Sequence, residues 1–308
     1  MTLALINTQI TIIVYLIIGF ILYKAKIIDH HAQVFISDMT INLLLPASVF
    51  VSFINSFTFD LLRSLFTILL FATLLEIALY LCTKIPNKYF SYSENCVNHY
   101  GMLVSNGGLV GTPVIESIFG SIGVMYCNVF MIPTRIMAYS AGESIFNPKL
   151  KRNYKDIILS VITNKVIIVM VLGCMFVFFN WEIPSAIFTA ISKISGCLAP
   201  MSLMLVGSML AQNTDINFDL VKKVSIITIL RLIIIPLCSL LVCLLMHLNF
   251  ETTAVIVLLM GMPVGSSCAS FAKCYKGNEK YATAVVLVST LLSTISLVGL
   301  MRIIEMLF

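Results

Sequence analysis

The chain has 308 residues, of which 59% are hydrophobic and 11% charged, and its mean hydropathy is +1.03. Soluble globular chains are nearer half apolar and a quarter charged. The composition therefore excludes a secreted disulfide scaffold, a nucleic-acid-binding module and a soluble enzyme with a large head domain. A bilayer core about 30 Å thick takes roughly 20 apolar residues per helix, so we expect a polytopic all-α membrane protein.

Hydropathy and the polar residues between the apolar segments predict ten membrane-spanning helices along the chain. Short polar connections separate them, and the fourth and fifth segments are divided only by the tripeptide at 119–121. The predicted spans are residues 8–23, 33–55, 61–83, 97–119, 121–143, 158–180, 187–211, 225–247, 252–274 and 281–303.

The basic residues indicate how these spans are oriented. Lys and Arg next to membrane helices mark the cytoplasmic side. If the N-terminus is outside, most of the 19 Lys and Arg residues fall in cytoplasmic connections, and Arg63, Lys193 and Arg302 are external. We therefore expect a multi-pass protein of the cell membrane, with both termini outside.

Two short motifs occur once in each half of the chain. Pro46 in the second segment has a counterpart in Pro200 of the seventh, and Gly111-Thr112-Pro113 in the fourth has one in Gly261-Met262-Pro263 of the ninth. Two halves of five helices, residues 1–150 and 151–308, must have opposite orientations because five is odd. The pattern predicts an inverted-topology repeat.

Proline and glycine inside a membrane helix interrupt its hydrogen bonds, and lipid cannot satisfy the freed groups. Paired interruptions in two inverted halves indicate a carrier's substrate site. Pro46 and Pro200 are candidates for such breaks or for kinks that serve packing, and Asn42 is expected to brace the backbone near Pro46. The richer run from Asn106 to Pro113 predicts a true break, where Asn106 binds substrate or caps the backbone.

These residues resemble the auxin efflux carrier family of permeases, which includes bacterial malonate and malate carriers and plant auxin exporters. The resemblance covers the whole chain. The run from Asn106 to Pro113 is similar to the family's fourth helix, and the segment from Arg231 to Pro236 is similar to its eighth. The absence of a long loop after the fifth segment favours the bacterial branch and hence the bacterial inner membrane.

The resemblance implies a fold of the NhaA and bile-acid-symporter type, with two inverted five-helix repeats whose helices 4 and 9 are broken and cross. It implies a scaffold of helices 1, 2, 6 and 7, a transport domain of helices 3–5 and 8–10, an organic-anion substrate and a homodimer through the scaffold. The candidate substrate-binding residues are Asn106, Gly107, Gly108, Gly111, Pro113, Arg135, Pro263 and Gly265.

Several charged residues lie within predicted spans, where a charge is expensive and normally serves a purpose, and three of them are candidates for a specific role. Arg135 is expected either to bind the substrate anion or to pair with Glu116 or Glu143. Glu76 and Arg231 are each eight residues, about 12 Å, from the cytoplasmic ends of their helices. Equal depth and opposite charge predict a structural ion pair, with a proton relay as the alternative.

Enzyme and nucleotide-binding signatures are absent from the sequence: it has no HExxH, GxSxG or Walker-type loop. We therefore expect no catalytic residues, cofactor or metal site. The leading hypothesis is a secondary or potential-driven carrier of small carboxylates that works by alternating access of the elevator type, coupled to H⁺ or Na⁺. The alternative is an anion-binding membrane sensor without turnover.

Overall fold

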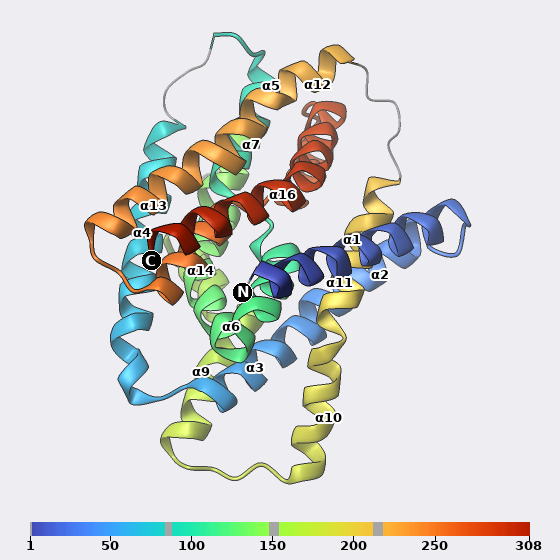
Figure 1. The fold of residues 1–308 in the computed structure, drawn as a ribbon. Coiled ribbons are helices and arrows are strands. Elements are labelled where there is room, and N and C mark those ends of the chain that lie inside the picture. The colour runs from blue at the N-terminus through green and yellow to red at the C-terminus, as the bar shows by residue number, and fades with distance from the viewer. Residues whose placement is uncertain (1, 84–87, 148–153, 212–217) are drawn as a thin grey trace. The chain divides into compact units, whose positions relative to one another are not determined.

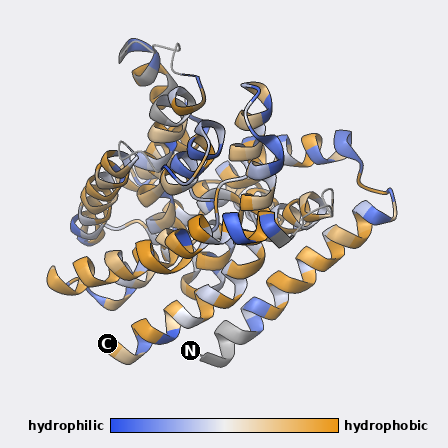
Figure 2. Ribbon diagram, turned by 90° about the horizontal axis from the view of Figure 1, so that it is seen from above, coloured by the Kyte–Doolittle hydropathy of each residue, from blue (hydrophilic) through white to orange (hydrophobic). Residues whose placement is uncertain are grey.

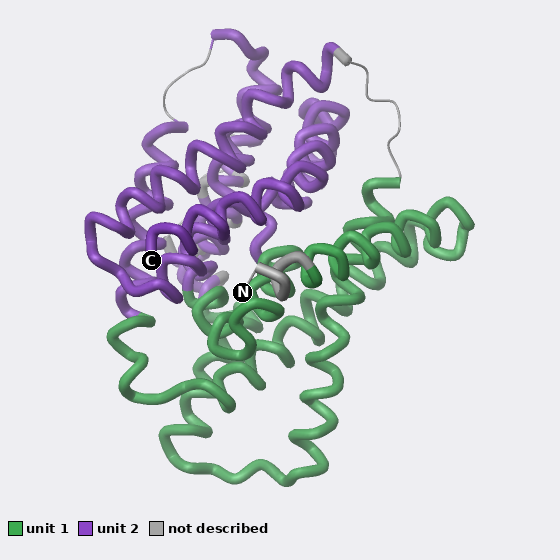
Figure 3. Tube along the Cα trace, viewed as in Figure 1, with its two compact units in different colours: residues 1–65, 108–129, 162–214 green, residues 66–107, 130–161, 215–308 purple. Residues whose placement is uncertain are grey.

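The computed structural model describes residues 2–83, 88–147, 154–211 and 218–308, and the regular structure of this part of the chain consists of helices and one isolated β-bridge (Figure 1). The chain divides into two compact units, residues 1–65, 108–129 and 162–214 in one and residues 66–107, 130–161 and 215–308 in the other (Figure 3). Each unit combines segments from both halves of the sequence.

Seven helices within the described ranges are long and apolar enough to cross a membrane, and two shorter apolar helices accompany them. The seven are Asn7–Lys24, His30–Ser56, Phe59–Cys82, Gly107–Met137, Ser185–Leu210, Asp219–Leu245 and Glu279–Leu307. The shorter two are Lys165–Phe178 and Phe250–Met260. A multi-pass membrane protein is thus confirmed, whereas ten spans in an inverted repeat stay a prediction.

Unit 1 contains six α-helices that lie wholly within its residues. They are α1 (Thr2–Lys24), α2 (His30–Met39), α3 (Leu45–Ser56), α9 (Lys165–Phe178), α10 (Ser185–Gly196) and α11 (Leu198–Leu210). Helices α1 and α11 lie side by side, and glycines bring their backbones together. A Cβ on Gly207 would lie 2.1 Å from the carbonyl oxygen of Leu16, and one on Gly19 would lie 1.9 Å from that of Met204. Small residues at both contacts are typical of membrane helix packing.

Helices α2 and α3 are joined by the π-helical turn η1 (Thr40–Leu44), and Pro46 is the second residue of α3. Proline has no N–H and its ring clashes with the carbonyl four residues earlier, and the wider turn relieves both problems. Pro46 therefore does not interrupt the helix, and of the two alternatives for this proline, a break or a kink that serves packing, the π-turn is nearer the second. Pro200 is likewise inside α11, just after the short division at Cys197.

Unit 2 contains most of the remaining helices. They are α5 (Tyr92–Leu103), α7 (Glu143–Phe146), α12 (Phe218–Ile229), η5 (Leu230–Ile234), α13 (Ile235–Leu245), α14 (Phe250–Met260), α15 (Ser267–Cys274) and α16 (Glu279–Leu307). Helix α14 is at its centre, and every residue from Thr252 to Met260 is buried. A helix that is apolar on all sides is expected to be enclosed by others.

Four elements contain residues of both units. They are α4 (Leu62–Cys82), η3 (Gly107–Gly111), α6 (Thr112–Met137) and α8 (Tyr154–Ile162). Two short turns, η2 (Phe59–Leu61) and η4 (Ala138–Gly142), precede α4 and α7. The predicted division between the fourth and fifth segments is a kink inside α6, where Gly120 has φ 59° and ψ −149°. A side chain is strained at this positive φ, so glycine allows the change of direction.

Large apolar side chains are exposed on the outer faces of many helices, including Ile10, Ile17 and Ile21 of α1 and Leu241 and Leu245 of α13. Figure 2 shows the apolar residues spread along the helices. Exposed apolar surface on this scale is unsuited to water and is accounted for by contact with lipid tails.

Candidate functional site

Unit 2 contains two places where the chain leaves the helical conformation in the middle of an apolar segment. The first is Val104–Asn106, between α5 and η3, and the second follows α14 and ends where α15 begins at Ser267. Both lie in the motifs that predicted paired breaks. Backbone groups freed by these interruptions need partners, because lipid offers none.

The two interruptions satisfy each other. The Asn106 amide donates to the Pro263 carbonyl (2.8 Å) and the Gly265 amide donates to the Val104 carbonyl (2.9 Å). Ser105 and Val264 form the antiparallel bridge between them. Three of the predicted site residues, Asn106, Pro263 and Gly265, are therefore neighbours although they are far apart in the sequence.

Arg231 connects the same two interruptions from a third element. It lies in η5, the π-helical turn that precedes Pro236, and its side chain is 1% exposed. Its Nε donates to the carbonyl of Met262 (3.1 Å) and its Nη1 donates to the carbonyl of Met102 (2.8 Å). A planar guanidinium can serve two diverging acceptors at once, so Arg231 holds the ends of both helices in a fixed relation.

Glu76 of α4 is as deeply buried as Arg231, at 1% exposed. One carboxylate oxygen, Oε1, accepts a short hydrogen bond from the hydroxyl of Thr134 on α6. The other, Oε2, has no hydrogen-bond partner within the described part of the chain. The charges of Glu76 and Arg231 attract each other, but their hydrogen bonds run to Thr134 and to two carbonyls. The predicted pairing is thus electrostatic and not a direct salt bridge.

Asn106 is also left with unused hydrogen-bonding capacity. Its side chain is 5% exposed, and its Nδ2 has no partner among the residues that the structure describes. The next residue, Gly107, packs against Met131, whose sulfur would lie 2.3 Å from a Cβ at this position. A side chain at this position would therefore require Met131 to move. The side-chain amide of Asn106 remains available as a donor at the break.

The other predicted site residues are distributed along η3 and α6. Gly108 and Gly111 lie in η3, and Pro113 is the second residue of α6. Arg135 is half-buried near the end of α6. The side chain of Glu143 lies outside the described residues, so the choice between substrate and carboxylate partners for Arg135 stays a prediction.

Asn42 has a different partner from the one that the sequence suggested. Its Oδ1 accepts a hydrogen bond from the ammonium of Lys165 at 2.7 Å. The pair joins η1 to the first residue of α9 within unit 1. Asn42 therefore contacts a neighbouring helix, and the π-turn itself accommodates Pro46.

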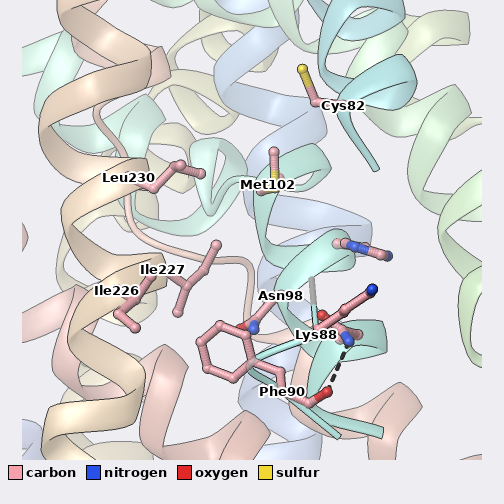
Figure 4. Close-up of a pocket in the computed structure, with 10 residues that line it drawn as sticks. Cys82, Lys88, Phe90, Asn98, Met102, Ile226, Ile227 and Leu230 are labelled. Carbon is pink, nitrogen blue, oxygen red and sulfur yellow. Dashed lines mark hydrogen bonds between the residues drawn. The ribbon is translucent and has the colours of Figure 1, made fainter. Parts of the chain in front are cut away.

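A pocket of about 360 Å³ opens within unit 2 beside α5 and α12 (Figure 4). Its polar lining includes Lys88 and, from α5, Asn98 and His99, and its apolar lining includes Met102 and Leu230. Met102 supplies one of the carbonyls that Arg231 contacts, and Leu230 is the neighbour of Arg231 in η5. The pocket therefore extends to Met102, two residues before the first interruption begins at Val104.

The sequence carries a signal for this pocket that the hydropathy pattern alone does not reveal. Asn95, Asn98, His99 and Met102 are spaced as one face of a helix, and three of these four residues are polar. From sequence, Lys88 is only a topological marker and His99 only an interfacial residue. Which side of α5 faces an opening depends on α12, which is distant in the sequence.

Helix α5 is fixed at its start by a capping box. The Ser91 hydroxyl accepts from the Glu94 amide (3.3 Å), and the Glu94 carboxylate accepts from the Ser91 amide (2.9 Å) and from the ammonium of Lys223 on α12 (3.0 Å). Burial acts to raise the pKa of Glu94, but the hydrogen bonds from Ser91 and Lys223 outweigh it and hold the pKa below its usual range.

Comparison with known protein families shows which family the chain belongs to. It matches the family described as membrane transport protein over residues 4–301, which is nearly its whole length. No curated relative matches it. The family match and the apolar helices agree with the resemblance seen in the sequence motifs. The chain belongs to the auxin efflux carrier family of membrane transport proteins.

Proposed function

We propose that this transporter carries small organic anions, such as malonate, malate or auxin-like aromatic acids, and binds them where the two chain interruptions meet. The observation that supports this most is the Nδ2 group of Asn106, a buried hydrogen-bond donor beside Pro263 that has no partner within the described ranges. A buried donor without an acceptor costs about 1–3 kcal/mol, and a carboxylate oxygen would supply the acceptor.

The electrostatic setting also supports an anion. The guanidinium of Arg231 is fully buried and its hydrogen bonds run to neutral carbonyls, so a positive charge lies at the backbone of both interruptions. The pocket beside α5 would give access from a side that carries Lys88 and His99. Cationic groups along such a path raise the local concentration of an anion.

For the mechanism we propose movement of the elevator type. Unit 2 contains all the residues just described, and unit 1 contains α1–α3 and α9–α11. This division supports a transport domain of helices 3–5 and 8–10 on a scaffold of helices 1, 2, 6 and 7. It differs at residues 108–129, which cluster with unit 1. The ten-span inverted repeat and its halves 1–150 and 151–308 belong to the same proposal.

Several further expectations stay predictions. They are the bacterial branch, the outside position of both termini, the inner-membrane location, a homodimer through the scaffold and coupling to H⁺ or Na⁺. The connection at 148–153, whose shortness indicated the bacterial branch, lies outside the described residues. Membership of a transport family favours turnover over the alternative of a membrane sensor.

Thermal stability of the purified protein tests the substrate class. The panel contains mono- and dicarboxylates and aromatic acids, each with and without sodium. An acid present at about 100 times its dissociation constant should stabilise the protein by roughly 2.7 kcal/mol. The shift should disappear in Asn106→Ala and persist in Asn278→Ala, a matched control whose amide caps α16. A panel in which no carboxylate raises the melting temperature would refute the organic-anion proposal.

A further inference from the structure

Glu76 is the most unusual carboxylate in the described part of the chain. It is 1% exposed, one oxygen accepts from Thr134, and the other has no hydrogen-bond partner among the described residues. An ionised carboxylate in such a place lacks the two or more donors that normally compensate its desolvation. A protonated carboxyl group needs much less compensation, because it carries no charge.

The surroundings of Glu76 contain a charge that acts on it. Arg231, on η5, attracts the carboxylate without hydrogen-bonding to it. On α6, Arg135 follows Thr134, the hydroxyl donor, and on α4 itself Tyr80 lies one turn further along. Arg231 therefore stabilises the ionised form electrostatically, while the missing hydrogen bonds favour the neutral form. Because the attraction of Arg231 and the missing hydrogen bonds oppose each other, neither the ionised nor the protonated form of Glu76 is strongly excluded, and the carboxyl group can bind and release a proton.

We propose that Glu76 is a proton-binding site that couples movement of the anion to movement of a proton. This inference rests on the proposed function and names its coupling ion. The reaction at Glu76 is the binding of one proton to a carboxylate to give a carboxylic acid, with no other bond made or broken.

Charge balance around Arg231 makes the coupling obligatory. With Glu76 ionised and no substrate bound, the Arg231 and Glu76 charges cancel. With Glu76 protonated, the Arg231 charge is unbalanced in a low-dielectric interior, and a substrate carboxylate restores neutrality. The two states of low energy are the ionised, empty unit and the protonated, anion-bound unit. One proton therefore accompanies each substrate molecule whose carboxylate balances Arg231.

Infrared difference spectroscopy on the purified wild-type protein tests proton binding without any substrate. Spectra at successive pH values should show the carbonyl band of a buried carboxylic acid that disappears as the pH rises. The band should be lost in Glu76→Gln and retained in Glu116→Gln, which removes another carboxylate of the spans. A folded wild-type protein without such a band, or a band that survives in Glu76→Gln, would overturn the proposal.

Uptake of radiolabelled malonate into proteoliposomes tests the coupling, with the membrane potential held at zero. One proton per malonate molecule predicts about tenfold greater accumulation for each pH unit by which the outside is more acidic than the inside. In Glu76→Gln, exchange of internal for external malonate should persist while the response to the pH gradient is lost. Wild-type uptake that ignores the gradient overturns the proton site and leaves the proposed function standing. The absence of carboxylate binding in the thermal panel overturns both.

Discussion

Replacing Arg231 tests the role of the residue that connects the two interruptions. Arg231→Met keeps much of the side chain's volume and removes both donors, so the carbonyls of Met102 and Met262 lose their charged partner. A hydrogen bond to a charged group contributes about 1.5–3 kcal/mol, and two of them contribute about 3–6 kcal/mol. The variant no longer buries a cation, which offsets part of this loss, and Glu76, which loses its balancing charge, avoids a buried unpaired charge by binding a proton. We therefore expect Arg231→Met to lower the free energy of unfolding by about 3 kcal/mol, the lower end of this range.

Arg231→Lys should lower the free energy of unfolding by about half as much as Arg231→Met. An ammonium is a point charge and cannot donate to two diverging carbonyls at once, as the planar guanidinium does. The matched control is Arg302→Met on α16. Arg302 pairs with Glu305 at 3.6 Å and its side chain is 48% exposed. Glu305 is 18% exposed, but the half-exposed guanidinium is well solvated, so the pair contributes little and the control should change stability by less than about 1 kcal/mol.

A thiol-reactive fluorophore can follow these unfolding transitions. Four free cysteines, Cys96, Cys127, Cys243 and Cys268, are buried and become reactive when the protein opens. The order of melting temperatures should be wild type and Arg302→Met highest, Arg231→Lys next and Arg231→Met lowest. If Arg231→Met melts together with Arg302→Met, Arg231 does not hold the interruptions and the reasoning is wrong.

Three further changes probe the packing that supports the site. Gly207→Ala places a Cβ against the Leu16 carbonyl and should separate α1 from α11, lowering the melting temperature, whereas Gly299→Ala, which meets open space, should not. Tyr281→Phe removes the hydroxyl that donates to Asn98 (2.9 Å) and should lower the free energy of unfolding by about 1–3 kcal/mol in denaturation assays. Tyr89→Phe is the exposed control, and equal stabilities of the two variants would contradict this prediction. Because the pKa of Glu94 is depressed in the folded state, its stabilisation is complete above the unfolded pKa of about 4.3 and is lost as the pH falls below it. The acid side of the stability profile should therefore flatten in Glu94→Gln, and an unchanged profile would count against the Ser91 and Lys223 contacts.

Much of the helical arrangement could be predicted from sequence because lipid imposes strict rules on each segment separately. The last predicted span, 281–303, falls within α16 (Glu279–Leu307), and the Gly and Pro motifs marked both chain interruptions. The backbone at Pro46 is harder to predict, because a proline inside an apolar segment is compatible with either a break or a kink in the helix. The choice of a π-turn depends on neighbours that the local sequence does not specify.

The candidate site was less predictable because its contacts join distant segments. Glu76 and Arg231 lie near enough for their charges to interact, as their equal depth indicates. Depth could not show that the guanidinium would bond to the carbonyls of Met102 and Met262, since those carbonyls are free only once both helices are interrupted. The pocket beside α5 was missed for the same reason: α12 supplies one of its walls.

Uptake into proteoliposomes tests the central claim most directly. Radiolabelled malonate, malate and an aromatic acid are offered to vesicles that contain wild-type protein, Asn106→Ala or no protein. The account predicts saturable uptake of at least one of these acids by the wild type and its loss in Asn106→Ala. Uptake that equals the protein-free vesicles for every acid, or a flux that never saturates, would contradict it.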